Sequence, residues 1–170
     1  MRHLLFAALL GALFGSPALA QSDFPLVEIS LGYGNLTLSP THHSGFVSQQ
    51  DINLSKWYGI DNYVGYFNLG NNATAFTNVF GGRAIVRSPK GYAAYGVAGI
   101  GWSRLSLASF ALGGMASSRV GGGVDVPINQ AAKIRVDVSR LSFHTGNGGG
   151  SGPAWQSGMS YAGGILLVLQ

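Results

Sequence analysis

Polar and apolar residues alternate along much of this sequence, most clearly near its end. Within residues 133–139, Ile134, Val136 and Val138 alternate with polar or charged side chains. A period of two residues is typical of a β-strand with one apolar and one polar face. A glycine-rich loop over residues 144–153 separates this segment from a final apolar strand, residues 159–170. Pairing that strand with the first strand of the chain would close the sheet and leave no free edge.

Eight strand-like segments follow one another after residue 25. They cover residues 26–38, 46–54, 60–69, 76–87, 92–102, 111–127, 133–139 and 159–170. Short turns alternate with longer polar or glycine-rich loops, which we place around Thr41, Gly70, Leu107 and Gly148. The spacing predicts an all-β fold, an eight-stranded antiparallel up-and-down transmembrane β-barrel.

Two stretches leave alternatives open. In the third segment either Tyr63 or Tyr66 can face outward, so its two faces stay unassigned. After Ser139 the inward positions fall on the apolar Leu141 and Phe143 and an outward one falls on Arg140. Either a bulge interrupts the strand there or the strand has left the bilayer.

Aromatic residues mark the ends of the predicted apolar band. In the fifth segment an apolar face of small residues runs from Tyr92 to Trp102, a rise of about 25 Å in a tilted strand. This is the height of a lipid-facing band between two rings of aromatic side chains. The residues assigned to such an aromatic girdle are Trp57, Tyr58, Tyr92 and Trp102.

Composition favours an exported membrane protein. Residues 1–20 combine Arg2, an apolar run and small residues at Ala18 and Ala20, which predicts a signal peptide before a single barrel domain over residues 21–170. Charged residues make up only 9% of the chain, against roughly a quarter in soluble domains, and there is no cysteine for a disulfide scaffold. A net charge of +4 without a basic cluster gives no reason to expect nucleic acid binding.

The inward positions of the predicted strands carry charges of both signs. They are Glu28, Asp125 and Asp137 against Arg83, Arg119 and Arg135, with Lys133 near one rim. An eight-stranded barrel is filled by its own side chains, so buried charges must pair. We therefore predict a structural network of ion pairs in the lumen; the alternative is a path for protons or ions through the same groups.

No site for catalysis, a cofactor or a metal ion is predicted. His144 invites comparison with the outer-membrane lipid A deacylases of the PagL type, which carry a His-x-Ser on a late strand and a carboxylate on the last one. Here Gly146 occupies the serine position and no acid follows Asp137. His42 and His43 are adjacent, which is not a spacing for metal ligands. The chain is thus expected not to be an enzyme.

The whole segment after residue 20 resembles the small outer-membrane β-barrel family of the OmpA transmembrane domain and OmpX type. The resemblance rests on residues 53–59 (NLSKWYG), 121–126 (GGGVDV), 134–137 (IRVD) and 160–165 (SYAGGI). Members usually end in phenylalanine, whereas this sequence ends in Leu169 and Gln170.

The resemblance implies a monomeric barrel of a Gram-negative outer membrane, with a structural or surface-interaction role. Expected partners are outer-membrane lipids, lipopolysaccharide and, during insertion, the barrel assembly machinery. The alternatives are a narrow pore or small-molecule carrier, a deacylase-like enzyme, and a soluble lipocalin-like carrier.

Overall fold

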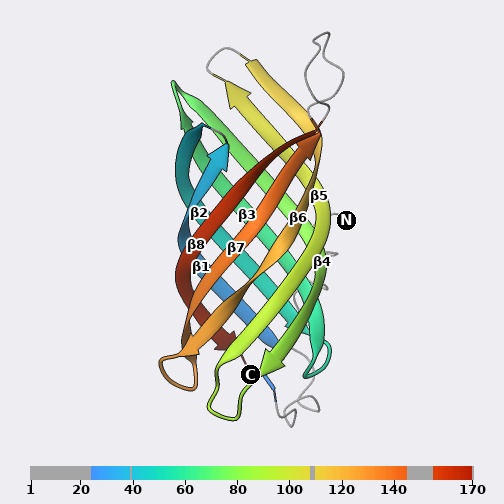
Figure 1. Ribbon diagram of the computed structural model, residues 1–170, viewed down its shortest axis with the longest axis vertical. Coiled ribbons are helices and arrows are strands. Elements are labelled where there is room, and N and C mark those ends of the chain that lie inside the picture. Colours follow the sequence, from blue (N-terminus) through green and yellow to red (C-terminus); the bar gives the residue numbers. More distant parts are fainter. Residues whose placement is uncertain (1–23, 39, 108–109, 145–154, 170) are drawn as a thin grey trace, which may run out of the picture.

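The chain forms a closed barrel of eight antiparallel strands in the order β1 to β8, which confirms the predicted fold class (Figure 1). The computed structural model describes residues 24–38, 40–107, 110–144 and 155–169. The predicted signal peptide and the loop around Gly148 lie outside these ranges. The strands are β1 (Val27–Leu38), β2 (Thr41–Asn53), β3 (Tyr58–Gly70), β4 (Ala73–Arg87), β5 (Ala93–Leu107), β6 (Phe110–Pro127), β7 (Ala132–His144) and β8 (Trp155–Leu169).

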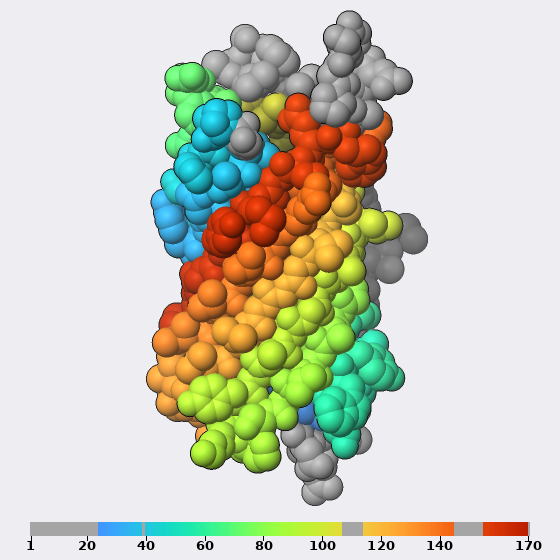
Figure 2. Space-filling model, viewed as in Figure 1, coloured from blue at the N-terminus to red at the C-terminus, as the bar shows by residue number. Residues whose placement is uncertain are grey.

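The barrel closes where β1 pairs with β8, as the sequence predicted. Following the register once around the barrel from Val27 leads back to β1 at Thr37, ten residues further along the strand. With eight strands, this stagger corresponds to a strand tilt of roughly 40° and a lumen that side chains can fill. The tilted strands form a continuous wall on the face seen in Figure 2.

Several strands are longer than the sequence predicted. The polar stretches at Thr41 and Gly70 are not loops: Thr41 begins β2 and Gly70 ends β3. The β3–β4 hairpin turns through Asn71 and Asn72, whose φ angles of 50° and 57° are the positive values that tight hairpins use. Polar side chains in these stretches were misleading, because strands that extend beyond an apolar band can be polar on both faces.

The open question in β7 is resolved without a bulge. Its register with β6 and β8 runs through Arg140 and Phe143 without a shift, so Leu141 and Phe143 point inward and are buried. The alternation does not slip at Ser139. Beyond Ser139, toward the end of β7 at His144, the side chains that point into the lumen change from polar to apolar.

The two ends of the barrel differ. The lower end in Figure 1 holds the starts of β1, β3, β5 and β7 and the C-terminal end of β8, together with the turns around residues 54–57, 88–92 and 128–131. The upper end holds the β1–β2, β3–β4 and β5–β6 hairpins. Within the described ranges the chain has no helix of the length and apolarity needed to cross a membrane.

The outer wall is apolar over most of its height. Large side chains that are more than a third exposed point outward from every strand, among them Leu31, Phe46, Ile60, Phe80, Ile100, Val120, Val136 and Ile165. We call this surface the apolar belt. Soluble monomers rarely expose contiguous apolar patches of such extent, which points to a non-aqueous surrounding.

Glycines at the closing seam allow β1 and β8 to approach closely. A Cβ on Gly164 would meet the carbonyl oxygen of Leu31 and lie 2.5 Å from the Cα of Gly32. The adjacent Gly163 points outward, and a Cβ there would meet nothing within 4 Å. Two neighbouring glycines therefore differ completely in the space around them.

We predict that Gly164→Val lowers the free energy of unfolding by about 1–3 kcal/mol, the usual effect of forcing extra atoms into a packed site. Gly163→Val is the matched control and should change it by less than about 0.5 kcal/mol. Urea unfolding of each variant, refolded in the same lipid vesicles, measures both. Equal losses for the two variants would contradict the close approach of Gly164 to the backbone of β1.

Candidate functional site

The lower half of the lumen is filled by charged side chains that are almost completely buried. The structure places all six residues of the predicted network here, with exposed fractions of at most 3%. Asp51, Asp61 and Lys133 join them. Together they form the ion-pair network: Glu28, Asp51, Asp61, Arg83, Arg119, Asp125, Lys133, Arg135 and Asp137.

Arg135 on β7 is held by two carboxylates. Its Nε and Nη2 donate to the two oxygens of Asp125 at 2.7 and 2.9 Å, a bidentate pair. Its Nη1 donates to Asp51 Oδ2 at 2.6 Å and to Gln49 Oε1 at 2.9 Å. Charge-assisted bidentate bonds of this kind are the strongest that side chains form, so Arg135 is fixed in one orientation.

Arg83 on β4 connects three acids. Its Nη1 donates to Asp51 at 2.5 Å and to Glu28 at 3.1 Å, and its Nη2 donates to Asp125 at 3.1 Å. Lys133 Nζ donates to the other oxygen of Glu28 at 3.0 Å. These acids and bases come from β1, β2, β4, β6 and β7, so the ion pairs link strands that are not neighbours.

Arg119 on β6 forms the upper part of the network. It donates to Asp61 at 2.6 Å, to Asp137 at 2.7 Å and, through Nε, to Ser139 Oγ at 2.9 Å. Its three partners lie on β3 and β7, so this arginine also bridges the lumen.

Two tyrosines cover the guanidinium groups. The ring of Tyr95 lies 4.4 Å from the guanidinium carbon of Arg83 and 4.7 Å from that of Arg135, and its hydroxyl donates to Asp137 at 2.9 Å. The ring of Tyr63 lies 4.4 Å from the guanidinium carbon of Arg119. A desolvated cation over an aromatic face is attracted by the electrons of the ring, which adds to the ion pairs.

Asp61 is the network residue that the sequence did not reveal. It lies on β3, whose faces were left unassigned, and it pairs in register with Asp51 on β2. The sequence does contain the information needed to place this residue. An aspartate that faces lipid is very unfavourable, so the alternation in β3 that turns Asp61 inward is the favoured one. Asp51 on β2 could have been assigned from the sequence, because Gln49, Asp51 and Asn53 alternate with the apolar Ile52 and Leu54.

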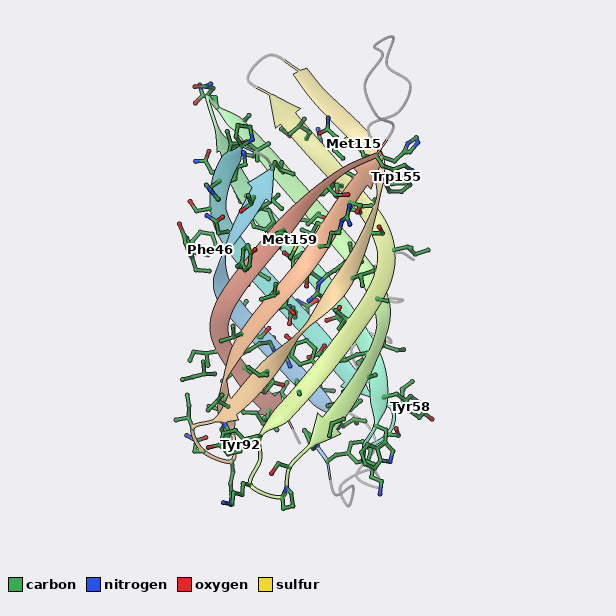
Figure 3. The ribbon with its side chains drawn as sticks, in the orientation of Figure 1. Phe46, Tyr58, Tyr92, Met115, Trp155 and Met159 are labelled. Carbon is green, nitrogen blue, oxygen red and sulfur yellow. The ribbon has the colours of Figure 1, made fainter. Side chains whose placement is uncertain are left out.

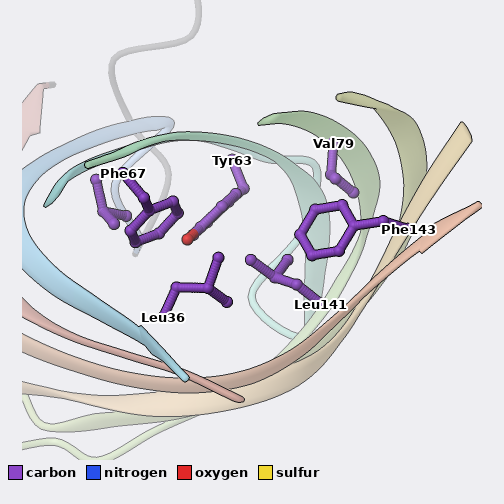
Figure 4. Packing of buried hydrophobic residues seen from close by; sticks show 7 residues of the cluster. Leu36, Tyr63, Phe67, Val79, Leu141 and Phe143 are labelled. Carbon is purple, nitrogen blue, oxygen red and sulfur yellow. The ribbon is translucent and has the colours of Figure 1, made fainter. Parts of the chain in front are cut away.

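Above the network, apolar side chains fill the lumen. The cluster drawn in Figure 4 consists of Leu36, Val47, Tyr63, Phe67, Val79, Leu141 and Phe143, all buried. They come from β1, β2, β3, β4 and β7 and meet across the barrel.

The ion-pair network leaves little empty space. A cavity of about 10 Å³ next to Gln49 and Arg135 has room for one water molecule at most.

The girdle residues lie at two levels of the outer wall. Tyr58 and Tyr92 are at the lower end in Figure 3, and Trp57 is in the turn next to Tyr58; these three are 50–57% exposed. Trp102, 46% exposed, lies further up β5 and stacks with Phe76 at 5.2 Å between ring centroids. Their role at a membrane interface stays a prediction here.

The histidines do not assemble a site within the described residues. His144 points outward and packs its ring against Trp155, with 5.1 Å between centroids. His42 and His43 contact the hydroxyls of Thr37 and Thr41 at 2.9 and 2.8 Å. In the part of the chain that the structure describes, no three acids, histidines or cysteines are grouped to hold a metal ion.

We predict that Arg119→Leu and Arg135→Leu each lower the free energy of unfolding by about 3–5 kcal/mol, because each leaves buried carboxylates without a partner. Lys90→Leu, at an exposed position in a turn, is the control and should change it by less than about 0.5 kcal/mol. The temperature at which the compact band on a gel converts to the unfolded one compares the three variants. Equal temperatures would contradict the role of the network in stability.

We also predict that Asp51→Asn is more damaging than Asp61→Asn. Asp51 accepts from two arginines, whereas Asp61 accepts from one and faces a like charge in Asp51. Either substitution removes the repulsion between the two carboxylates, so the difference comes from the number of arginines that lose a charged acceptor. The midpoints of urea unfolding in the same vesicles measure the difference, and a lower midpoint for Asp61→Asn would overturn the prediction.

Comparisons with known proteins give the fold. No protein-family model matches the chain, and no curated protein matches its sequence. Among solved structures, Neisserial surface protein A is 11% identical with a TM-score of 0.61 over 84% of this chain and 96% of its own. Ail, the attachment invasion locus protein of Yersinia pestis, is 13% identical with a TM-score of 0.53 over 84% of this chain and 97% of its own.

The outer membrane protein OprG from Pseudomonas aeruginosa is 9% identical, with a TM-score of 0.56 over 88% of this chain and 98% of its own. At these identities the likeness concerns the backbone architecture and not the side chains. It agrees with the resemblance to the OmpA transmembrane domain and OmpX group that the sequence indicated. This chain therefore has the fold of the small eight-stranded outer-membrane β-barrels.

Proposed function

We propose that this chain is an integral outer-membrane barrel that does not conduct and that acts as a scaffold for surface interactions. One observation carries the proposal: an ion-pair network is buried inside the barrel, and large apolar side chains are exposed on the outer wall of every strand. Arg83 and Arg119 are 2% and 1% exposed, whereas Ile100 and Phe46 are 77% and 70% exposed. A soluble lipocalin-like carrier would need the opposite distribution.

The aromatic residues support a membrane position. Trp57, Tyr58 and Tyr92 border the apolar belt at the lower end, and Trp102 borders it further up. Amphipathic rings are enriched where a membrane meets water. Outer-membrane lipids and lipopolysaccharide are the expected surroundings of the apolar belt, after export through the predicted signal peptide and insertion by the assembly machinery.

The upper end supports a surface role. There β1 and β2 continue past the apolar belt, and their outward residues become polar from Asn35 to Thr37 and from His42 to Ser44. At the lower end the belt reaches the turns themselves, as Tyr58 and Tyr92 indicate in Figure 3. Barrels of this kind have short turns on the periplasmic side, so we orient the polar extension toward the outside of the cell.

The filled lumen favours this role over a pore or a carrier. Two layers block the path: the ion-pair network and, above it, the apolar cluster around Phe67 and Leu141. The names of two structural neighbours describe an attachment protein and a surface protein. The surroundings of His144 give no support for enzymatic activity, because in the described part of the chain its ring packs against the ring of Trp155.

Fractionation and conductance test the proposal together. We expect the mature protein in the outer-membrane fraction, released by detergent alone, with a gel band that shifts on heating. Purified protein in a planar bilayer should give no steady single-channel current. Release without detergent would overturn the membrane assignment, and a steady current would favour the pore.

A further inference from the structure

The lipid-facing surface of β2, β3 and β4 carries polar side chains in the middle of the apolar belt. Their neighbours along the chain, such as Gln49, Asp61 and Val79, are buried in the lumen, so these side chains point outward. Apolar residues border them along each strand. The polar patch consists of Ser48, Gln50, Asn62 and Asn78, all half-buried.

The patch is local and lies on three adjacent strands. Gln50 pairs in register with Asn62, and Ser48 and Asn78 both pair with Val64, the apolar centre of the patch. On β7, on the opposite side of the barrel, the outward side chains of Ile134, Val136 and Val138 are apolar, and the next outward residue is the exposed Arg140. The patch thus differs from β7 in grouping four uncharged polar side chains on three adjacent strands.

Hydrogen bonds within the patch use part of its capacity. Asn62 Nδ2 donates to Asn78 Oδ1 at 2.7 Å, and Gln50 Nε2 donates to Ser48 Oγ at 2.6 Å. A primary amide has two N–H donors and an oxygen that can accept two bonds. Donors and acceptors of both kinds thus remain on the surface, and hydrocarbon chains supply no partner for them.

We propose that the polar patch is the interface through which two copies of this chain dimerise in the membrane. This inference rests on the proposed function, which places the chain in the outer membrane. A second copy fits because amides are self-complementary: across a two-fold axis each copy donates to and accepts from the other. The patch carries no charge that would repel its own copy. A monomer, as the family resemblance implies, is the alternative that cross-linking distinguishes.

Cysteine cross-linking tests the pairing directly, because the sequence has no cysteine of its own. Val64→Cys puts a thiol at the centre of the patch and leaves its four polar residues in place. In isolated outer membranes treated with a short bis-maleimide, we expect a product of twice the protein's mass. Val138→Cys, which exposes its thiol to lipid on the opposite side, is the control and should give none.

The polar groups are tested by a second pair of variants in the Val64→Cys background. Asn62→Leu together with Asn78→Leu should reduce the cross-linked fraction roughly tenfold, since polar contacts between membrane segments are lost. Ser118→Leu, an outward polar position on β6 outside the patch, should leave the fraction unchanged. The heat-induced gel shift establishes that each variant is folded.

Three results would overturn the dimer. They are a folded Val64→Cys protein in the outer membrane without the product, equal products from Val64→Cys and Val138→Cys, and a product whose mass shows a different protein as partner. If the chain is absent from the outer-membrane fraction, the proposed function fails and the dimer fails with it.

Discussion

The narrowness of the lumen is the constraint on which this structure depends. Eight strands with a stagger of ten residues leave a lumen that side chains fill, so ions inside cannot keep a shell of water. Each arginine of the network therefore contacts at least two carboxylates, and Tyr63 or Tyr95 covers its guanidinium. Because these partners come from different strands, the pairing also holds the wall of the barrel together.

The same constraint separates two layers within the lumen. Where acids and bases are available on facing strands, the lumen is ionic; above them, Leu36, Phe67 and Leu141 exclude water without any charge. The apolar belt outside needs no partner within the chain. A barrel with charges buried in its lumen and apolar side chains on its outer wall is suited to a bilayer.

Regular alternation made much of this predictable. Arg83, Arg119, Asp125, Arg135 and Asp137 lie on strands with one apolar and one polar face, so their direction follows from a period of two. In β3 both faces carry aromatic residues, and the pattern does not distinguish inside from outside. Asp61 was missed for that reason. In β7 the inward Leu141 looked like a slip, because an apolar residue in a polar series is also what a bulge would give.

The sequence by itself determined the number of strands, the closed all-β fold and the direction of most side chains, because these follow from local periodicity and turn residues. Only the tertiary structure decided which charges meet. Arg83 and Asp125 are far apart in sequence, and their contact depends on strand register and tilt around the whole barrel. The same holds for the polar patch. Ser48 and Asn78 lie on either side of Val64 only because of the register of three strands.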